Sequence, residues 1–289
     1  MNELTGSAPT QVLCRHSGRC CFFRAAFQKS DQVVIPLKNP IQPKTLPVFS
    51  LCLGLVGLVL QIILLSTGLD GKGLLITGSL PEICSWILTG CSLLILLLGI
   101  RDLGGIPRGS RLFPASPLAA IGTCVGGAGI AHAAIRSLLS SGSFVYLISA
   151  IAGFASVLCL AALAYCRWKG QAITLFVRMP IILFFTMYSL CEYRIWTAST
   201  QLMEYAFPML AIVFLLLTSY HRAALEVRMN GRRSYVFCNL AALYFSLLAV
   251  PHNPIFYLAM AVWMLSDTCS LQQLVRRPRP AVQEPQSEE

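Results

Sequence analysis

Two ionisable side chains lie within long apolar blocks, and they are the residues best placed to do chemistry. Arg178 stands about six residues into one block, and Asp267 stands about four or five residues before the end of another. A charged group inside a bilayer costs roughly 2.5–3.5 kcal/mol on insertion scales, so each one needs a partner. Their depths match, which predicts an ion pair between them, with Asn239 as a hydrogen-bonding neighbour.

This polar site has two interpretations that the sequence leaves open. A static Arg178–Asp267 pair would lock two helices together, whereas a mobile pair would serve gating or solute transport. Pro180 follows Arg178 closely, and it would weaken the helix there and could free a backbone carbonyl. Snorkelling of either side chain towards water is a further structural explanation.

A second group of charged and titratable residues is expected at the outer ends of the apolar blocks. These residues could line a vestibule for a charged solute, or they could be ordinary charges of loops and helix ends. The residues are Glu82, His132, Arg136, Glu192, Arg194 and Glu204, with Asp70, Lys72 and His252 nearby. His132 and Arg136 stand four residues apart, so they share one helix face.

The elements that must position these residues are long apolar helices. Of 289 residues, 56% are hydrophobic and only 12% are charged, whereas a soluble domain carries about a quarter charged residues. Blocks of about 20 apolar residues match a hydrocarbon core, and only a helix satisfies their backbone groups within the segment. We therefore predict an all-α transmembrane bundle of eight spans. The spans are expected at 47–66, 81–100, 118–139, 143–165, 172–190, 201–220, 234–250 and 255–271.

The basic residues predict the orientation of these spans. Placing both termini in the cytoplasm puts 18 of the 22 lysines and arginines on the cytoplasmic side, as the positive-inside rule requires. Residues 1–46 and 272–289 are then cytoplasmic tails around a transmembrane domain at 47–271. We expect the multi-pass chain to lie in the cell membrane. Its basic charge is explained by the cytoplasmic loops, so no nucleic-acid partner is expected.

Two sequence patterns suggest how the spans pack. Gly122 and Gly126 form a GxxxG motif in the third span, which predicts close helix contacts and a central position in the bundle. Tyr146 and Tyr257 each begin a Tyr-Leu-x-x-Ala pattern, which suggests four-plus-four halves at 47–169 and 172–271. Chance similarity between leucine-rich helices is the alternative to such a duplication.

The motifs of the common catalytic and metal sites are missing from the sequence. It contains no HExxH, no Gly-x-Ser-x-Gly and no glycine-rich nucleotide loop. The 12 cysteines are scattered without a CxxC, so neither a zinc site nor a disulfide framework is predicted. We therefore expect no catalytic residues, no cofactor and no metal, and a protein that is not an enzyme.

The last hundred residues carry a resemblance to known proteins. The segments EYAFPMLAIVFLLLTSYHRAA and FYLAMAVWMLSDTCSL resemble a group of uncharacterised multi-spanning bacterial membrane proteins. The resemblance implies a bacterial cytoplasmic membrane and brings no activity or ligand. The leading hypothesis is a non-enzymatic protein that acts by packing or by binding a membrane partner. The alternative is a small-solute transporter with its polar site at Arg178 and Asp267.

Overall fold

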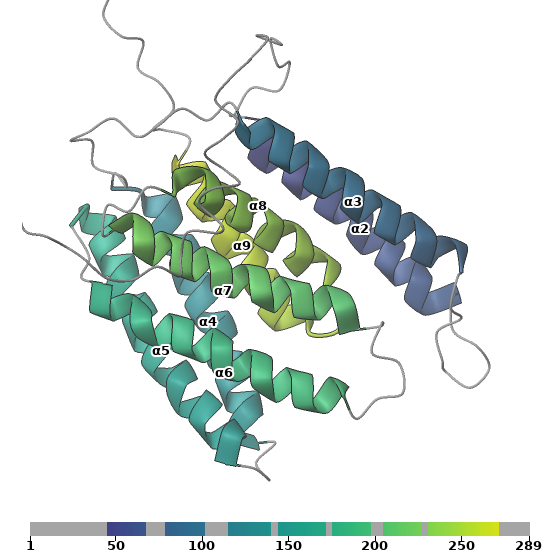
Figure 1. Ribbon diagram of the computed structural model, residues 1–289. Helices are drawn as coiled ribbons and strands as arrows, with labels where there is room; N and C mark the ends of the chain where they lie inside the picture. Colours follow the sequence, from purple (N-terminus) through teal and green to yellow (C-terminus); the bar gives the residue numbers. More distant parts are fainter. Residues whose placement is uncertain are drawn as a thin grey trace, which may run out of the picture. The chain divides into compact units, whose positions relative to one another are not determined.

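The described residues are almost entirely helical. The computed structural model describes residues 45–67, 79–101, 115–139, 144–171, 175–197, 205–226 and 231–271. The helices are α2 (Leu46–Thr67), α3 (Leu80–Arg101), α4 (Pro117–Leu139), α5 (Phe144–Lys169), a 3-10 turn η1 (Leu175–Arg178), α6 (Met179–Trp196), α7 (Ala206–Glu226), α8 (Arg232–Leu248) and α9 (Pro254–Leu271). Figure 1 shows this order. Each of the eight predicted segments contains a helix, and no strand occurs in the described residues.

Proline fixes where several of the helices begin. Its ring cannot follow a turn of helix, but it fits the first turn, where its missing N–H costs no hydrogen bond. The prolines in first turns are Pro47, Pro81, Pro117, Pro180, Pro208 and Pro254. Pro180 therefore lies at the start of α6 and does not break a longer helix. Its carbonyl accepts a hydrogen bond of 2.8 Å from the Ser156 hydroxyl of α5.

Six of the helices are long and apolar enough to cross a membrane, namely α2 to α5, the η1–α6 segment and α7. The chain therefore fits a multi-pass integral membrane protein. The segments expected to be the seventh and eighth spans, α8 and α9, are helices of 17 and 18 residues that fall outside this group. Helix α8 has Arg232 and Arg233 at its start and Asn239 further along, which lowers its apolar character.

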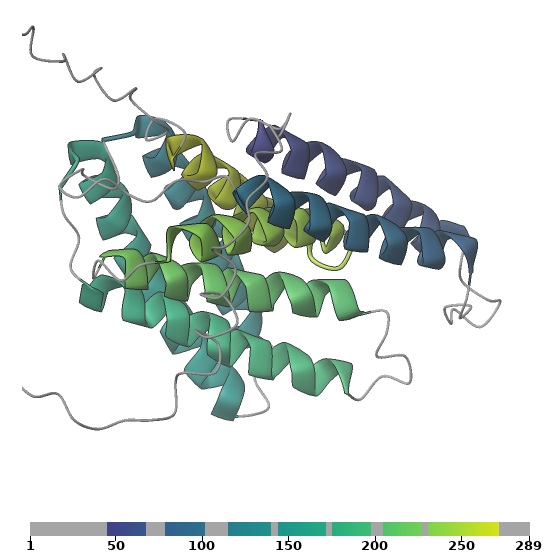
Figure 2. The ribbon, with the colours of Figure 1, turned by 45° about the horizontal axis from the view of Figure 1, so that its top comes forward.

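The core of the bundle lies around α8, of which 13 of the 17 residues are buried. This helix packs against α2, α3, α7 and α9, while α4, α5 and α6 pack in sequence on the other side of α9 and α7. In Figures 1 and 2, the α2–α3 hairpin lies beside α8 and away from α5 and α6. The central position predicted for the small-residue helix α4 is wrong, because α8 holds it.

Close approach of α4 to its neighbours is confirmed. The glycines of one α4 face turn towards α9, where an added Cβ on Gly122 would collide with the Ser266 side chain. A Cβ on Gly126 would lie 2.8 Å from the Trp263 ring. The missing Cβ atoms let the backbones of α4 and α9 approach each other. Such close packing stabilises helix pairs in lipid, where there is no hydrophobic driving force between helices.

Helix α3 buries polar residues and exposes apolar ones, which is the opposite of a helix on the surface of a soluble protein. Its buried residues include Glu82, Ser85, Thr89 and Ser92, while Leu80, Ile87 and Leu94 are more than 60% exposed. Thr89 contacts the hydroxyl of Tyr244 on α8 at 3.1 Å. An apolar exterior with a polar contact face suits a helix whose outer side meets lipid.

The other predicted features are only partly covered by these residues. Of the two predicted tails, 1–46 and 272–289, residues 1–44 and 272–289 lie outside the described residues. The four-plus-four repeat stays a prediction.

Candidate functional site

Five charged residues gather at one end of the bundle, and we call them the Asp267 cluster: Arg167, Arg178, Arg222, Glu226 and Asp267. They come from α5, η1, α7 and α9. Arg167, Arg178, Arg222 and Asp267 are each no more than 3% exposed. Such burial of charge in an apolar bundle requires partners on other helices, because desolvation otherwise costs several kcal/mol per ion.

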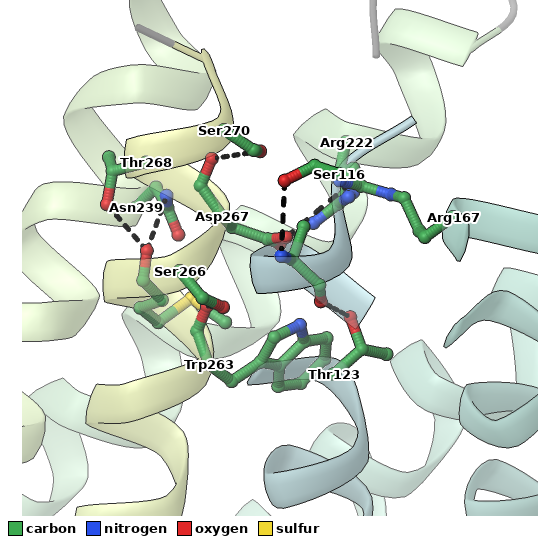
Figure 3. Close-up of polar contacts among 12 residues, drawn as sticks. Ser116, Thr123, Arg167, Arg222, Asn239, Trp263, Ser266, Asp267, Thr268 and Ser270 are labelled. Atoms are coloured by element: carbon green, nitrogen blue, oxygen red, sulfur yellow. Dashed lines mark hydrogen bonds and ion pairs between the residues drawn. The ribbon is translucent and has the colours of Figure 1, made fainter. Parts of the chain in front are cut away.

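Asp267 is the centre of this cluster, with its carboxylate placed between two arginines. Arg222 of α7 forms an ion pair with Oδ2, and Nη2 of Arg167 on α5 lies 3.5 Å from Oδ1. Figure 3 shows both guanidinium groups reaching the carboxylate from different helices. Three helices, α5, α7 and α9, are therefore linked through one carboxylate.

The neighbouring hydroxyl groups of α9 donate to backbone carbonyls of their own helix and not to the Asp267 carboxylate, which contacts the arginines. Ser270 donates to the backbone carbonyl of Asp267 at 2.7 Å, and Thr268 donates to the carbonyl of Met264 at 2.6 Å. Ser266 likewise donates to the backbone carbonyl of Trp263 within its own helix.

The start of α4 is bonded to the end of α5. Ser116 lies just before α4, and its backbone N–H donates to the carbonyl of Arg167 at 3.3 Å. This bond places the start of α4 beside the end of α5 (Figure 3).

Arg178 and Glu226 make a second pair in the same cluster. Nε of Arg178 donates to Oε2 of Glu226 at 2.6 Å, and Nη2 donates to Oε1 at 2.5 Å. This two-pronged geometry is the strong form of an arginine–carboxylate contact. Arg178 is the last residue of η1, so the pair ties the turn before α6 to the last residue of α7.

A small cavity lies among α6, α7 and α9 within this cluster. Its polar lining consists of Arg178, Thr218, Ser219, Arg222, Trp263 and Asp267. The volume of about 10 Å³ is close to the least space that holds one water molecule. The cavity adjoins the junction at which the 3-10 turn ends and α6 begins.

The predicted direct ion pair between Arg178 and Asp267 is wrong. Both side chains line the cavity, but Arg178 binds Glu226 and Asp267 binds Arg222 and Arg167. Matching depth in two helices does not fix the direction in which their side chains point, which depends on helix rotation. Asn239, the predicted neighbour, donates to the backbone carbonyl of Met264 at 3.3 Å, one turn before Asp267.

Three members of the cluster, Arg167, Arg222 and Glu226, were not predicted from the sequence. The spans were expected to end at residues 165 and 220, which assigned these charges to cytoplasmic loops. Helices α5 and α7 instead continue to Lys169 and Glu226. One signal for α7 was available, because Arg222 and Glu226 are four residues apart and Ala223 and Leu225 prolong the apolar character.

The predicted outer group is divided between two regions. Arg136 of α4 and Glu192 of α6 lie within electrostatic reach of each other, and Glu192 is hydrogen-bonded to Tyr188. Tyr257 of α9 is close to both charges. We call Arg136, Tyr188, Glu192 and Tyr257 the Glu192 cluster.

The remaining members of that group have separate surroundings. Glu82 is buried on α3, which packs against α2 and α8. His132 is half-buried one turn before Arg136, and Arg194 is exposed near the end of α6. Glu204, Asp70 and Lys72 lie outside the described residues.

The chemistry that the Asp267 cluster offers is the pairing and recognition of charge. In the parts of the chain that the structure describes, no group of three or more His, Cys, Asp or Glu side chains could hold a metal ion. Guanidinium groups bind carboxylates and other anions, and a buried carboxylate can exchange between them.

Comparisons with known proteins give no family for this chain. It matches no protein-family model, no curated protein and no solved structure.

Proposed function

We propose that this protein is a multi-pass protein of a bacterial cytoplasmic membrane that transports a small solute through the Asp267 cluster. In this proposal α8 and α9 are also spans, and both termini lie in the cytoplasm. The observation that supports transport best is the polar cavity beside the start of α6. Transporters commonly place their binding sites where helix N-termini and polar side chains face a cavity.

The charges of the cluster support the same proposal. Ionisable groups within membrane helices are costly to insert, and they generally mark a pathway or a site. Arg178 and Arg222 have separate carboxylate partners, yet both line the same cavity. A small movement of the η1 turn relative to α7 would therefore open the cavity. Asp267 would keep its contacts with Arg222 and Arg167, because neither arginine lies on η1.

A static, non-enzymatic role is the second candidate, in which the protein acts through packing or through a membrane partner. The observation in its favour is that the two carboxylates of the cluster are each held by arginines of other elements. Such links can lock α5, α7 and α9 and the turn before α6 in one arrangement. Under this alternative, the cavity never opens to either side of the membrane.

Accessibility of the cavity from the two sides of the membrane distinguishes these roles. Ser219 lines the cavity and would be replaced by cysteine in an otherwise cysteine-free full-length chain. A membrane-impermeant thiol reagent is then applied to right-side-out and to inside-out vesicles. Transport predicts labelling from both sides, because the site must open to each in turn. Failure to label from one side or from both would reject transport and favour the static role.

Two control positions complete this experiment. Ala241 of α8 is fully buried away from the cavity lining, so Ala241→Cys should stay unlabelled in both preparations. A Cβ added at Gly231 would meet nothing within 4 Å, so Gly231→Cys should be labelled only in inside-out vesicles. Labelling of Gly231→Cys from outside would overturn the proposed orientation.

A further inference from the structure

We propose that the cavity of the Asp267 cluster binds a small monovalent anion, held by Arg178, Arg222 and the indole N–H of Trp263. This inference rests on the proposed transport site and names its substrate class. The ligand would be a halide or an anion of similar size, because the volume of about 10 Å³ leaves no room for a sugar or an amino acid.

Trp263 provides the observation that points to a ligand. Its side chain lines the cavity and is 2% exposed, and its indole nitrogen has no hydrogen-bond partner among the described residues. In Figure 3 this nitrogen is turned towards the side of the ring on which Asp267 and Ser116 lie. The indole N–H can only donate a hydrogen bond, so it requires an acceptor. A buried donor without one is costly, which makes an acceptor in the cavity favourable.

The charges around the cavity favour an anionic acceptor. The guanidinium groups of Arg178 and Arg222 both line it, and guanidinium groups only donate hydrogen bonds. Helix α6 begins one residue after Arg178, so the positive end of its dipole lies on the same side. The ion pair of Arg222 with Asp267 shows that this guanidinium already accommodates a carboxylate.

The other polar lining groups do not create a cation site. Thr218 donates its hydroxyl hydrogen to the carbonyl of Phe214, and Ser219 donates to that of Leu215. Their lone pairs and the Asp267 carboxylate could attract a cation, but the two arginines in the lining would repel it. Asp267 instead acts as an internal competitor, since its carboxylate occupies a guanidinium that the bound anion would also use.

Bromide is the probe for this site. The purified full-length protein would be titrated with sodium bromide replacing sodium gluconate at constant ionic strength, with the thermal unfolding midpoint as readout. We expect bromide to raise the midpoint in a saturable manner. Trp263→Phe keeps the aromatic ring and removes the donor, so bromide should bind about tenfold more weakly. Asp267→Asn removes the competing charge and should bind bromide more tightly.

Trp168→Phe is the matched control for the tryptophan substitution. Trp168 lies on α5 and is 63% exposed, so its replacement should leave the bromide response unchanged. Equal responses of Trp168→Phe and Trp263→Phe, or no difference between bromide and gluconate, would overturn the anion site. Should Trp263→Phe fail to fold, anomalous scattering from bromide in crystals of the unmodified protein decides whether an ion contacts the Trp263 indole nitrogen.

These results are separable from those on transport. Two-sided labelling of Ser219→Cys without a bromide effect would keep the transport proposal and reject the anion. A bromide effect that depends on Trp263, with Ser219→Cys labelled from one side or neither, would keep the anion site and reject transport.

Discussion

The Asp267 cluster and the Glu192 cluster both put charge into the bundle, but they keep it there by different means. In the Asp267 cluster, each buried arginine meets a carboxylate from another element, and the residues come from α5, η1, α7 and α9. In the Glu192 cluster, the only arginine is exposed, and the buried groups are the neutral side chains of Tyr188 and Tyr257. The first cluster neutralises buried charge by pairing, whereas the second keeps its arginine exposed and its carboxylate half-buried.

A functional site is more readily expected where charge is fully buried than where it reaches the surface. A charged side chain at a helix end can snorkel to water, so the Glu192 cluster needs no further explanation. The arginines of the Asp267 cluster are no more than 3% exposed, and the protein sustains their desolvation. We therefore expect the two clusters to respond very differently to the same kind of substitution.

The largest effect is expected for Asp267→Ala, compared with Glu192→Ala as the matched change in the other cluster. Loss of Asp267 removes the carboxylate that faces two buried guanidinium groups, and it should lower the free energy of unfolding by about 3–5 kcal/mol. Glu192→Ala removes a hydrogen bond to Tyr188 and a contact with an exposed arginine, which is worth about 1 kcal/mol. Denaturant unfolding in detergent micelles measures both, and similar losses would erase the comparison.

A double-mutant cycle tests which arginine is the partner of Asp267. Arg222→Ala with Asp267→Ala should lose clearly less stability than the two single changes together, because the pair is removed as a unit. Arg178→Ala with Asp267→Ala should show weaker coupling, since Arg178 is held by Glu226. Additive losses for Arg222 and Asp267 would contradict the observed pairing.

An intermediate loss of stability is expected from a substitution at Gly122, the α4 glycine that packs against Ser266 of α9. Gly122→Ala puts a Cβ into the Ser266 side chain, and separating α4 from α9 should cost about 1–3 kcal/mol. Gly90→Ala on α3 is the control, because nothing lies within 4 Å of the added Cβ and alanine favours the helix. The same unfolding assay should find Gly90→Ala neutral or stabilising. Equal behaviour of the two variants would mean that the α4–α9 contact is looser than observed.

The smallest effect concerns pH at the Glu192 end of the bundle. His252 lies in the turn between α8 and α9, against the ring of Tyr205, which in turn stacks on Trp196. Burial lowers the pKa of His252 below its usual 6.5. The unfolded chain then binds a proton more readily than the folded one, so stability is full above pH 6.5 and falls as the pH drops below it.

The matching measurement is the thermal unfolding midpoint between pH 8 and pH 5. His252→Gln should flatten part of the decline that the unmodified protein shows below pH 6.5. An unchanged pH profile in this variant would show that the imidazole does not contribute.

Much of the fold followed from local properties of the sequence. The eight helices were predicted because apolar blocks of about 20 residues leave no other way to satisfy the backbone in lipid. Their ends were less predictable, and the errors at residues 165 and 220 hid Arg167, Arg222 and Glu226. An arginine near the end of an apolar block reads as a loop charge, and only its neighbours in space show that it is buried.

Apolar blocks of helical length are enough to make this chain helical and suited to a membrane, and they make Arg178 and Asp267 costly residues. The partners of these two residues are set by tertiary packing, because pairing depends on how each helix is rotated and on which helices pack together. Tertiary packing also makes α8 the central helix, and it leaves the buried, unpartnered indole N–H of Trp263 on the side of its ring where Asp267 lies. Composition and spacing act along one helix, whereas these features arise between helices far apart in sequence.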